Sequence, residues 1–440
     1  MSPFAWIKSS APVQVMIDTT FGPYLVGNTV SLVGTWMQRI ACSWLVWDWT
    51  GSAFWVGLLA ACDLMPVVFI SPLAGVLADR WDRLRLNVNA QVISIANAAL
   101  LAVLFWLSAL SLGMVMALTL IQGILTAITQ PSRFAMVQQM VSRDQVGAAV
   151  GLNSACVNIA RLVGPAIAGA MILHWSIGLV FALNAIVTIL FVGVLRRISL
   201  RPITRQGANP PFVHQLIKGF AYTFSTPALR LILLALFAGG IMVRSVVELM
   251  PVIAANAFRE PVLGLAVLTG AAAIGAILSG VTMGTPNPAT LLRNIPLWWG
   301  IGAVAAVGLT TTGHHWVAAL AAALLGGAIT KGLVSTQTFM QLTTPDDLRG
   351  RALSVFGLFA RGSPALGALA IGYAADHLGV GNATLAASAL LIALQLGLSI
   401  RLGKQSVEIA SELRASARPM RISDGFGLHC DFSIRPPTAT

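Results

Sequence analysis

Long apolar stretches, separated by short polar ones, follow one another along most of the chain. A helix needs roughly 20 predominantly apolar residues to cross a bilayer, and this criterion predicts twelve membrane spans. They lie near residues 22–48, 53–76, 87–110, 113–133, 146–172, 175–197, 229–255, 262–284, 295–312, 316–341, 350–374 and 380–402. We therefore predict an all-α membrane protein with 12 transmembrane helices.

The polar intervals divide these spans into two equal sets. The only long polar interval between spans, about 198–228, separates six spans from six. We predict an N-terminal six-helix half at 1–197, a central loop at 198–228, a C-terminal half at 229–402 and a tail at 403–440. The first part of the tail, 403–418, has the composition of a surface helix, and the rest has that of a disordered segment.

The composition excludes a soluble enzyme. Of the 440 residues, 57% are hydrophobic and 10% are charged, whereas soluble domains carry about 25% charged residues. The net charge of +12 does not indicate nucleic-acid binding, because most of the chain has no water-exposed surface on which to present it. The N-terminal residues lack the pattern of a secretory signal that is removed.

Neither a metal site nor a cofactor is expected. The four cysteines, Cys42, Cys62, Cys156 and Cys430, are widely spaced and form no Cys-x-x-Cys pair. They predict neither a disulfide framework nor a zinc site. An ATP-driven pump is disfavoured because the sequence has no Gly-x-x-x-x-Gly-Lys-[Ser/Thr] motif.

Basic residues flank the predicted spans almost entirely on one side. Of the 27 Lys and Arg, five lie within spans. Among those outside the spans, Arg259 alone lies on the side opposite the termini, and every other one lies on the side of the termini and the 198–228 segment. By the positive-inside rule, this distribution predicts that both termini are cytoplasmic. Eleven of the 12 Trp lie near span ends, where interfacial Trp is common, and Trp36 is the exception.

Two sets of residues recur at nearly one offset. Gly34, Met37 and Arg39 recur 205 positions later as Gly239, Met242 and Arg244. Asp144, Gly147, Gly164 and Gly169 recur 203 positions later as Asp347, Gly350, Gly367 and Gly372. The two sets lie at equivalent spans, so they favour duplication of a six-helix unit. Two such halves can rock around a site near the midplane, which is an architecture of transporters.

The loop after the second span carries an ordered motif. It reads Gly75-Val-Leu-Ala-Asp79-Arg80-Trp-Asp82-Arg83-Leu-Arg85. Small Gly75 permits close helix packing, Asp79 suits a helix N-terminus, and the arginines hold the loop on the cytoplasmic side. An ordinary basic loop has a similar composition. The order of residues, however, closely resembles the loop signature of the major facilitator superfamily, with Asp82 where that pattern usually has Gly.

A second motif lies in the fifth span. Gly151, Ala160, Gly164-Pro165 and Ala168-Gly169 resemble the glycine and proline pattern of the superfamily's drug exporters, with two glycines replaced by alanine. Small residues and a proline indicate a close-packed, bendable helix. A third family pattern fails, because Thr119 occupies the position of an Arg three residues before Gln122-Gly123. A coupling role for that Arg cannot be carried over.

The resemblance covers nearly the whole chain. The segments at 34–39, 50–52 and 350–351 look like the transmembrane secretion effector branch, which includes the enterobactin exporter and related siderophore and macrolide exporters. The likeness implies proton-driven export from the cytoplasm. We assign a role in conformational switching to the family-like residues Gly75, Asp79, Arg80, Arg83, Gly164 and Pro165.

Ionisable residues inside spans are costly and mark candidate functional sites. Those well inside are Arg39, Asp63, Arg161, Arg244, Glu248, Lys331 and Arg361. Arg39 and Asp63 lie at one depth of antiparallel neighbours, so they can meet. Arg244 and Glu248 are four residues apart, which permits a direct pair on one helix. Structural ion pairing is the alternative to a functional role for these four residues.

Basic residues outnumber acidic ones inside the spans. Arg161, Lys331 and Arg361 have no obvious acidic partner, and a positive surplus facing a water-filled cavity favours an anionic or zwitterionic substrate. Contacts with loop backbone or lipid headgroups are the alternative. We predict that the substrate is bound by Arg39, Arg161, Arg244 and Lys331. Asp63 and Glu248 are the candidates for proton exchange, because burial disfavours the charged form of a carboxyl group.

The intramembrane charges predict a secondary active transporter of a small amphipathic or anionic compound. The family resemblance implies that it exports this compound, a siderophore or an antimicrobial, in exchange for protons. The alternatives are an importer of a nutrient or organic acid and a non-transporting membrane receptor. The short loops and the tail of about 38 residues, 403–440, offer no signalling domain for a receptor. We expect a monomer in a bacterial inner membrane, whose partners are its substrate, protons and the lipid bilayer.

Overall fold

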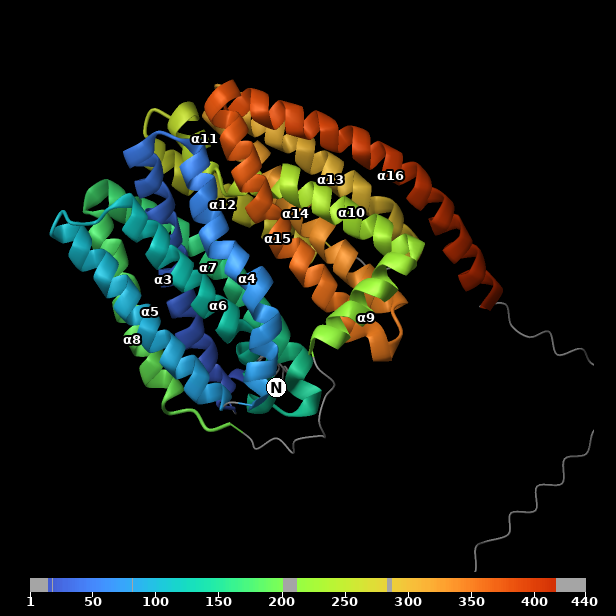
Figure 1. Ribbon diagram of the computed structural model, residues 1–440, viewed down its shortest axis with the longest axis horizontal. Helices are drawn as coiled ribbons and strands as arrows, with labels where there is room; N and C mark the ends of the chain where they lie inside the picture. The colour runs from blue at the N-terminus through green and yellow to red at the C-terminus, as the bar shows by residue number, and fades with distance from the viewer. Residues whose placement is uncertain (1–14, 18, 81, 201–211, 283–286, 417–440) are drawn as a thin grey trace, which may run out of the picture.

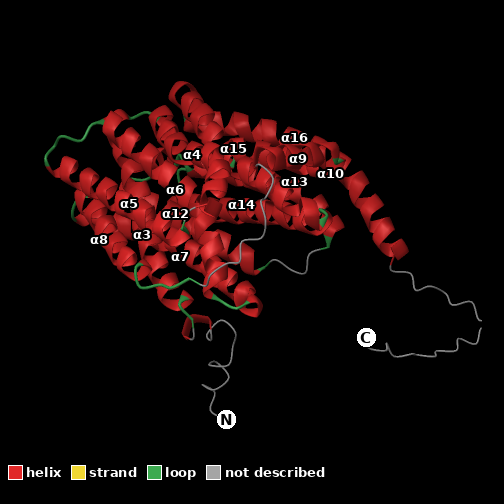
Figure 2. Ribbon diagram, turned by 60° about the horizontal axis from the view of Figure 1, so that its bottom comes forward, coloured by secondary structure: helices red, strands yellow, loops and turns green. Residues whose placement is uncertain are grey.

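The computed structural model describes residues 15–17, 19–80, 82–200, 212–282 and 287–416. Within these ranges the chain forms helices joined by short turns, and no β-strand is present (Figure 2). The long helices are α3 (Phe21–Thr50), α4 (Ala53–Arg80), α5 (Arg83–Trp106), α6 (Leu112–Met140), α7 (Val146–His174), α8 (Ile177–Leu195), α10 (Pro227–Met242), α12 (Pro261–Val281), α13 (Pro288–Thr311), α14 (His315–Thr343), α15 (Asp346–Leu378) and α16 (Val380–Ser416). The shorter ones are η1 (Arg143–Gln145), α9 (Phe212–Ser225), η2 (Arg244–Val247) and α11 (Met250–Ala257).

Eleven helices of the described chain are long and apolar enough to cross a membrane. They coincide with eleven of the twelve predicted spans, so the prediction of a multi-span, all-helical membrane protein is confirmed. The remaining segment, 22–48, falls on α3, which has 30 residues but is not among the eleven. Asn28, Gln38 and Arg39 lower the hydropathy of this helix. The twelfth span stays a prediction.

Local polar groups begin and end several helices. The Asp82 side chain accepts hydrogen bonds from the amides of Leu84 at 2.9 Å and Arg85 at 3.1 Å, which caps the start of α5. Gly51 ends α3 with a left-handed backbone, φ +57°, which glycine adopts without steric cost. Only Ser52 then separates it from α4. Such caps keep the connections between long helices short.

The long helices pack as two groups, with most contacts made inside each group (Figure 1). We call α3–α8 the first group and α9–α16 the second group. The main contacts between them join α4 to α15 and α7 to α12. Helices α4 and α15 approach closely where a Cβ on Gly57 would lie 2.2 Å from the Ala368 carbonyl oxygen. In Figure 1 the groups lie nearest each other at the upper end, where α11 ends and α12 begins.

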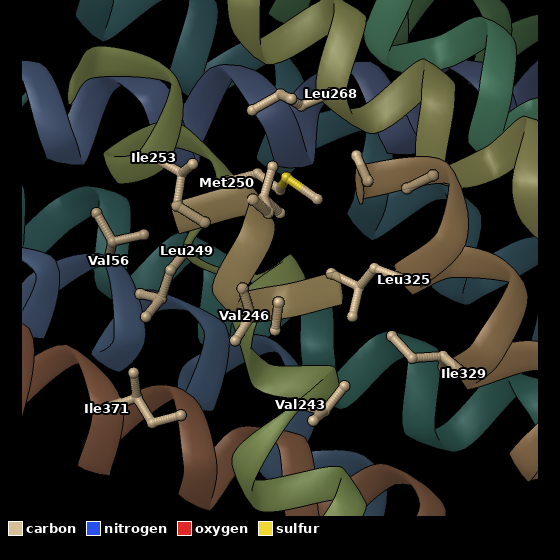
Figure 3. Close-up of a cluster of buried hydrophobic side chains, with 14 of the residues drawn as sticks. Val56, Val243, Val246, Leu249, Met250, Ile253, Leu268, Leu325, Ile329 and Ile371 are labelled. Carbon is tan, nitrogen blue, oxygen red and sulfur yellow. The ribbon is translucent and has the colours of Figure 1, made fainter. Parts of the chain in front are cut away.

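The predicted span at 229–255 is not one continuous helix. It is divided into α10, the short 3₁₀ helix η2 and α11. Pro251 stands at the start of α11, where its missing amide costs no hydrogen bond, and the residue before a proline is biased away from the helical backbone. Val246 and Leu249 lie buried at this break, among the apolar side chains of Figure 3. The break places Arg244 and Glu248 outside any continuous α-helix.

Two further differences concern the segments outside the spans. The interval at 198–228, predicted as a loop, contains α9. The rings of Phe220 and Phe224 on α9 lie 6.4 and 6.2 Å from that of Phe359 on α15. The predicted surface helix at 403–418 is continuous with α16, which runs to Ser416 (Figure 1). The remainder of the predicted tail, 417–440, lies outside the described residues.

Candidate functional site

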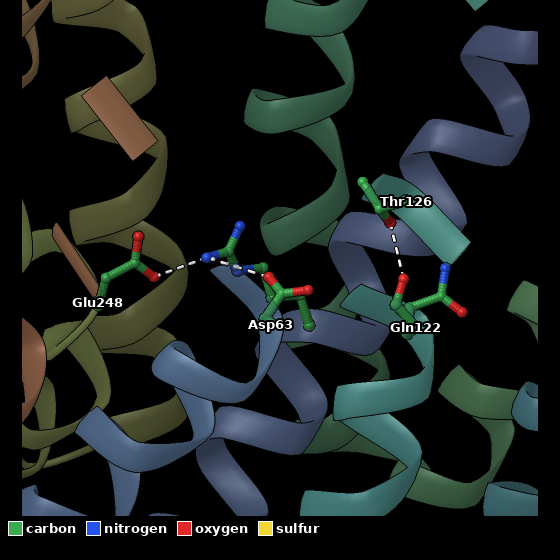
Figure 4. A network of polar contacts seen from close by, with 5 residues as sticks. Asp63, Gln122, Thr126 and Glu248 are labelled. Atoms are coloured by element: carbon green, nitrogen blue, oxygen red, sulfur yellow. Dashed lines mark hydrogen bonds and ion pairs between the residues drawn. The ribbon is translucent and has the colours of Figure 1, made fainter. Parts of the chain in front are cut away.

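Three charged side chains from both groups meet between α3, α4 and the end of η2 (Figure 4). The Arg39 guanidinium on α3 lies 2.8 Å from the Glu248 carboxylate and 3.3 Å from the Asp63 carboxylate on α4. The predicted meeting of Arg39 and Asp63 is confirmed. Because Glu248 belongs to the second group, Arg39 connects the two groups by a charge-assisted hydrogen bond.

The spacing of Arg244 and Glu248 permits a direct pair on one helix, but the structure shows no such pair. No ion pair joins these two residues within 4.0 Å, and the Glu248 carboxylate instead accepts a hydrogen bond from the Arg39 guanidinium. A 3₁₀ helix has three residues per turn, so residues four apart no longer lie on one face as they do on an α-helix. The Nη1 atom of Arg244 is buried and has no hydrogen-bond partner among the described residues.

Trp36 lies beside two of these arginines. The guanidinium of Arg39 lies 5.2 Å from the centre of the Trp36 ring, and that of Arg161 on α7 lies 5.1 Å from it. Both distances fit cation–π contacts. The Nε atom of Arg161 is buried and, like Nη1 of Arg244, lacks a hydrogen-bond partner in the described part of the chain. The charges of Arg161 and Arg244 are close enough to repel each other.

We call Arg39, Asp63, Arg161, Arg244 and Glu248 the central charge cluster. The side chains of Arg39, Asp63 and Glu248 are 27%, 20% and 13% exposed, although they lie between the two groups. Solvent-accessible space therefore reaches them. Three guanidinium groups against two carboxylates leave one net positive charge when all are ionised.

The remaining two predicted basic residues lie differently. Arg361 on α15 donates a hydrogen bond to the Gln130 side chain on α6, and its charge is near enough to Arg244 to interact with it. It therefore adds positive charge at the edge of the central charge cluster. Lys331 on α14 has its ammonium 4.4 Å from the centre of the Trp298 ring. The structure shows no contact between Lys331 and the cluster.

Small residues bring the helices of the cluster together. A Cβ on Gly164 would lie 2.6 Å from the Trp36 Cβ, so glycine lets α7 approach α3 beside the cluster. A Cβ on Gly123 would lie 2.6 Å from the Asp63 carbonyl oxygen, so α6 reaches the backbone of α4 there. Pro165 lies inside α7, which remains one helix. The predicted close packing of the fifth span is confirmed.

The loop motif lies at the junction of α4 and α5. Gly75, Asp79 and Arg80 belong to the last turns of α4, and their side chains lie outside the described residues. Arg83 is the first residue of α5. Asp82, which departs from the family pattern, caps α5 and lies 3.6 Å from the Arg85 guanidinium.

Sequence reasoning assigned no role to Trp36 or Gln130. The signal for Trp36 was present, because it was the one Trp placed away from the ends of the predicted spans. Gln130 gave no signal, because a lone amide in a helix identifies no partner 231 positions away. The functions predicted for the residues of the central charge cluster stay predictions.

Comparisons with known proteins identify the family. Residues 9–422 match the model of the transmembrane secretion effector family. The chain is 23% identical over 377 residues to macrolide efflux protein A of Streptococcus pyogenes, covering 84% of this chain and 93% of that protein. It is 24% identical over 359 residues to the staphyloferrin A transporter of Staphylococcus aureus, covering 79% and 87%.

Solved structures share the fold. A bacterial homolog of the human lysosomal transporter Spinster, in an inward-facing and unoccupied conformation, superimposes with a TM-score of 0.68 at 12% identity. The likeness covers 89% of this chain and 98% of that one. The nucleoside transporter NupG, in a D323A mutant, superimposes with a TM-score of 0.67 at 13% identity. The protein is a multi-span membrane transporter of small molecules and not an enzyme, and it belongs to the transmembrane secretion effector family of the major facilitator superfamily.

Proposed function

We propose that this protein exports a small anionic or amphipathic organic compound in exchange for protons. The observation that carries the proposal is the pair of buried guanidinium atoms, Nε of Arg161 and Nη1 of Arg244, that lack hydrogen-bond partners among the described residues. A buried donor left without a partner costs about 1–3 kcal/mol. A carboxylate or catecholate oxygen of a bound substrate removes that cost, and the planar fork of Arg suits such groups.

The relatives support export and give two substrate classes to compare. One is named a macrolide efflux protein and another a staphyloferrin A transporter. The positive surplus of the central charge cluster favours a negatively charged compound, so we infer a siderophore-like anion rather than a cationic drug. The Trp36 ring, which faces Arg39 and Arg161, offers a flat surface to an aromatic or apolar part of that compound.

We further propose that Asp63 and Glu248 carry the exchanged proton. Both carboxylates contact one guanidinium, that of Arg39. Protonation of Glu248 weakens the contact that connects α3 to η2, so proton binding and release bias the separation of the two groups. We propose that the protonated protein and the substrate-loaded protein make this movement in opposite directions, which is the requirement for exchange.

We propose an architecture of twelve spans in two pseudo-symmetric six-helix halves, 1–197 and 229–402, joined by 198–228 and followed by a tail at 403–440. The internal repeat supports it. Gly164 packs against Trp36, and its counterpart Gly367 packs against Ile241, the counterpart of Trp36. In the same way, Gly169 contacts α12 of the second group and Gly372 contacts α4 of the first. α3 then supplies the twelfth span.

The positive-inside distribution supports cytoplasmic termini in a bacterial inner membrane, and we propose that the protein works as a monomer. Gly75, Asp79, Arg80 and Arg83, together with Gly164 and Pro165, are proposed to govern the exchange between inward- and outward-facing states. Replacement of Asp79 by Asn is expected to slow transport without changing substrate affinity.

The test is transport by the purified protein in sealed vesicles. A carboxylate siderophore, a macrolide and an organic acid are each placed on the side of the vesicle that corresponds to the cytoplasm, and a proton gradient is then imposed. We expect efflux of the siderophore, accelerated by acid on the opposite side. Accumulation in the reverse direction would identify an importer. If the protein neither moves nor binds any of these three compounds, the proposal is contradicted.

A further inference from the structure

An apolar groove of about 650 Å³ lies between α13, α14 and α16, away from the central charge cluster. Its walls are formed by aliphatic side chains, several of them more than half exposed, such as Leu297, Val304 and Leu320. These helices are candidate membrane spans, so the exposed aliphatic side chains of the groove face lipid. On α13 the lining extends from Arg293 to Gly308, about 22 Å at a helical rise of 1.5 Å per residue.

Polar groups in the groove are few. Arg293 is the only charged residue among those lining it, and it has no ion pair or hydrogen bond among the described residues. It lies in the second turn of α13, near the end of the span. None of the described residues that line the groove is acidic, so an anionic group beside Arg293 meets no repulsion from them.

Gln395 supplies a second, independent observation. It lines the groove and is 3% exposed. Its Nε2 donates a hydrogen bond to the Ala235 carbonyl oxygen at 3.1 Å, which fixes the orientation of the amide. Its Oε1 is buried and has no donor in the described part of the chain. A ligand with a hydroxyl donor satisfies this atom.

We propose that the groove binds one anionic phospholipid with a hydroxylated headgroup, of the phosphatidylglycerol type. The phosphate lies against Arg293, a headgroup hydroxyl donates to Gln395, and an acyl chain follows α13 between α14 and α16. The 22 Å length of the groove exceeds the roughly 15 Å thickness of one leaflet's hydrocarbon layer, so a full chain fits. Basic sites between spans on the cytoplasmic side are a known mode of anionic lipid recognition, and the proposed orientation places Arg293 on that side.

Native mass spectrometry of the delipidated full-length protein tests this proposal. Phosphatidylglycerol and phosphatidylcholine with identical acyl chains are titrated separately. We expect one phosphatidylglycerol to bind at least fivefold more tightly than phosphatidylcholine. Arg293→Gln is expected to remove this preference, because a basic group near the membrane surface contributes about a factor of five. Arg230→Gln is the matched control, since Arg230 is exposed in the first turn of α10 and does not line the groove.

A second pair of variants fills the groove without changing charge. A Cβ on Gly300, which lines the groove, would meet no atom within 4 Å, so Gly300→Leu places its side chain in the groove without a backbone conflict. Gly280→Leu on α12 is the control, because its Cβ also meets open space but lies outside the groove. We expect only Gly300→Leu to lose the bound lipid, with unchanged melting temperatures for both. Equal binding of the two lipids, or unchanged binding in Arg293→Gln or Gly300→Leu, would overturn the proposal.

Discussion

Arg161 differs from Arg39 in having no carboxylate partner. Arg39 has two within 3.3 Å, whereas the Nε atom of Arg161 is buried without a hydrogen bond. Arg161→Ala is therefore expected to weaken binding of an anionic substrate about tenfold or more, because a charge-assisted contact contributes about 1.5–3 kcal/mol. Competition binding to the purified protein measures this, with exposed Arg259→Ala as the control. Unchanged affinity in Arg161→Ala would exclude Arg161 from the site.

Glu248 and Asp63 share one cation but differ in position. Glu248 contacts Arg39 across the two groups at 2.8 Å, and Asp63 does so within the first group at 3.3 Å. We expect Glu248→Gln to abolish the acceleration of export by an opposing proton gradient while leaving exchange of substrate for substrate intact. Asp63→Asn, measured in the same vesicles, shows which carboxyl group is required. Wild-type pH dependence in both variants would remove them as proton carriers.

Among the elements, the close contact of α7 with α3 rests on one glycine. A side chain at Gly164 would begin 2.6 Å from the Trp36 Cβ, whereas one at Gly151 on the same helix would meet nothing within 4 Å. Gly164→Leu is expected to destabilise the protein by about 1–3 kcal/mol, as overpacking does, and to lower its melting temperature. Gly151→Leu is expected to melt with the wild type. Equal melting of the two variants would show that α7 moves aside without cost.

The start of α4 is capped from the other group. The Asp376 carboxylate on α15 accepts hydrogen bonds from the Ser52 hydroxyl and from the Ala53 amide, the latter at 2.6 Å. Opening this end of the molecule separates the carboxylate from the helix, so the cap stabilises the closed arrangement. Replacement of a capping residue by Ala costs about 1 kcal/mol, and Asp376→Ala is therefore expected to shift the population about fivefold toward the open arrangement.

Spin labels at exposed Trp49 and Leu378 report this separation as a distance distribution. Asp82→Ala is the control, because Asp82 caps α5 within the first group. A distribution in Asp376→Ala that matches the wild type would show that the cap does not affect the equilibrium.

At the scale of the whole molecule, the helical fold could be read from apolar segments because a bilayer requires long apolar helices. The depth argument likewise found Arg39 and Asp63. Reasoning from the sequence failed where tertiary contacts decide the outcome. The i, i+4 rule assumed a continuous helix at Arg244, and the span breaks there instead. Nothing local in the sequence shows that Glu248 turns to Arg39, 209 positions away, or that α9 packs on α15.

The orientation of the whole molecule is the broadest prediction. Lys218 on α9 and Arg259 after α11 are both exposed, and they lie on opposite sides in the proposed topology. In a variant without native cysteines, a Cys at position 259 is expected to react with an impermeant thiol reagent added to intact cells. A Cys at position 218 is expected to react only after the membrane is permeabilised. The positive-inside rule acts through basic residues close to the ends of spans, and here all but one of those outside the spans favour the same side. Labelling in the reverse pattern would place the termini outside. The direction of the proposed exchange across the membrane would then be inverted.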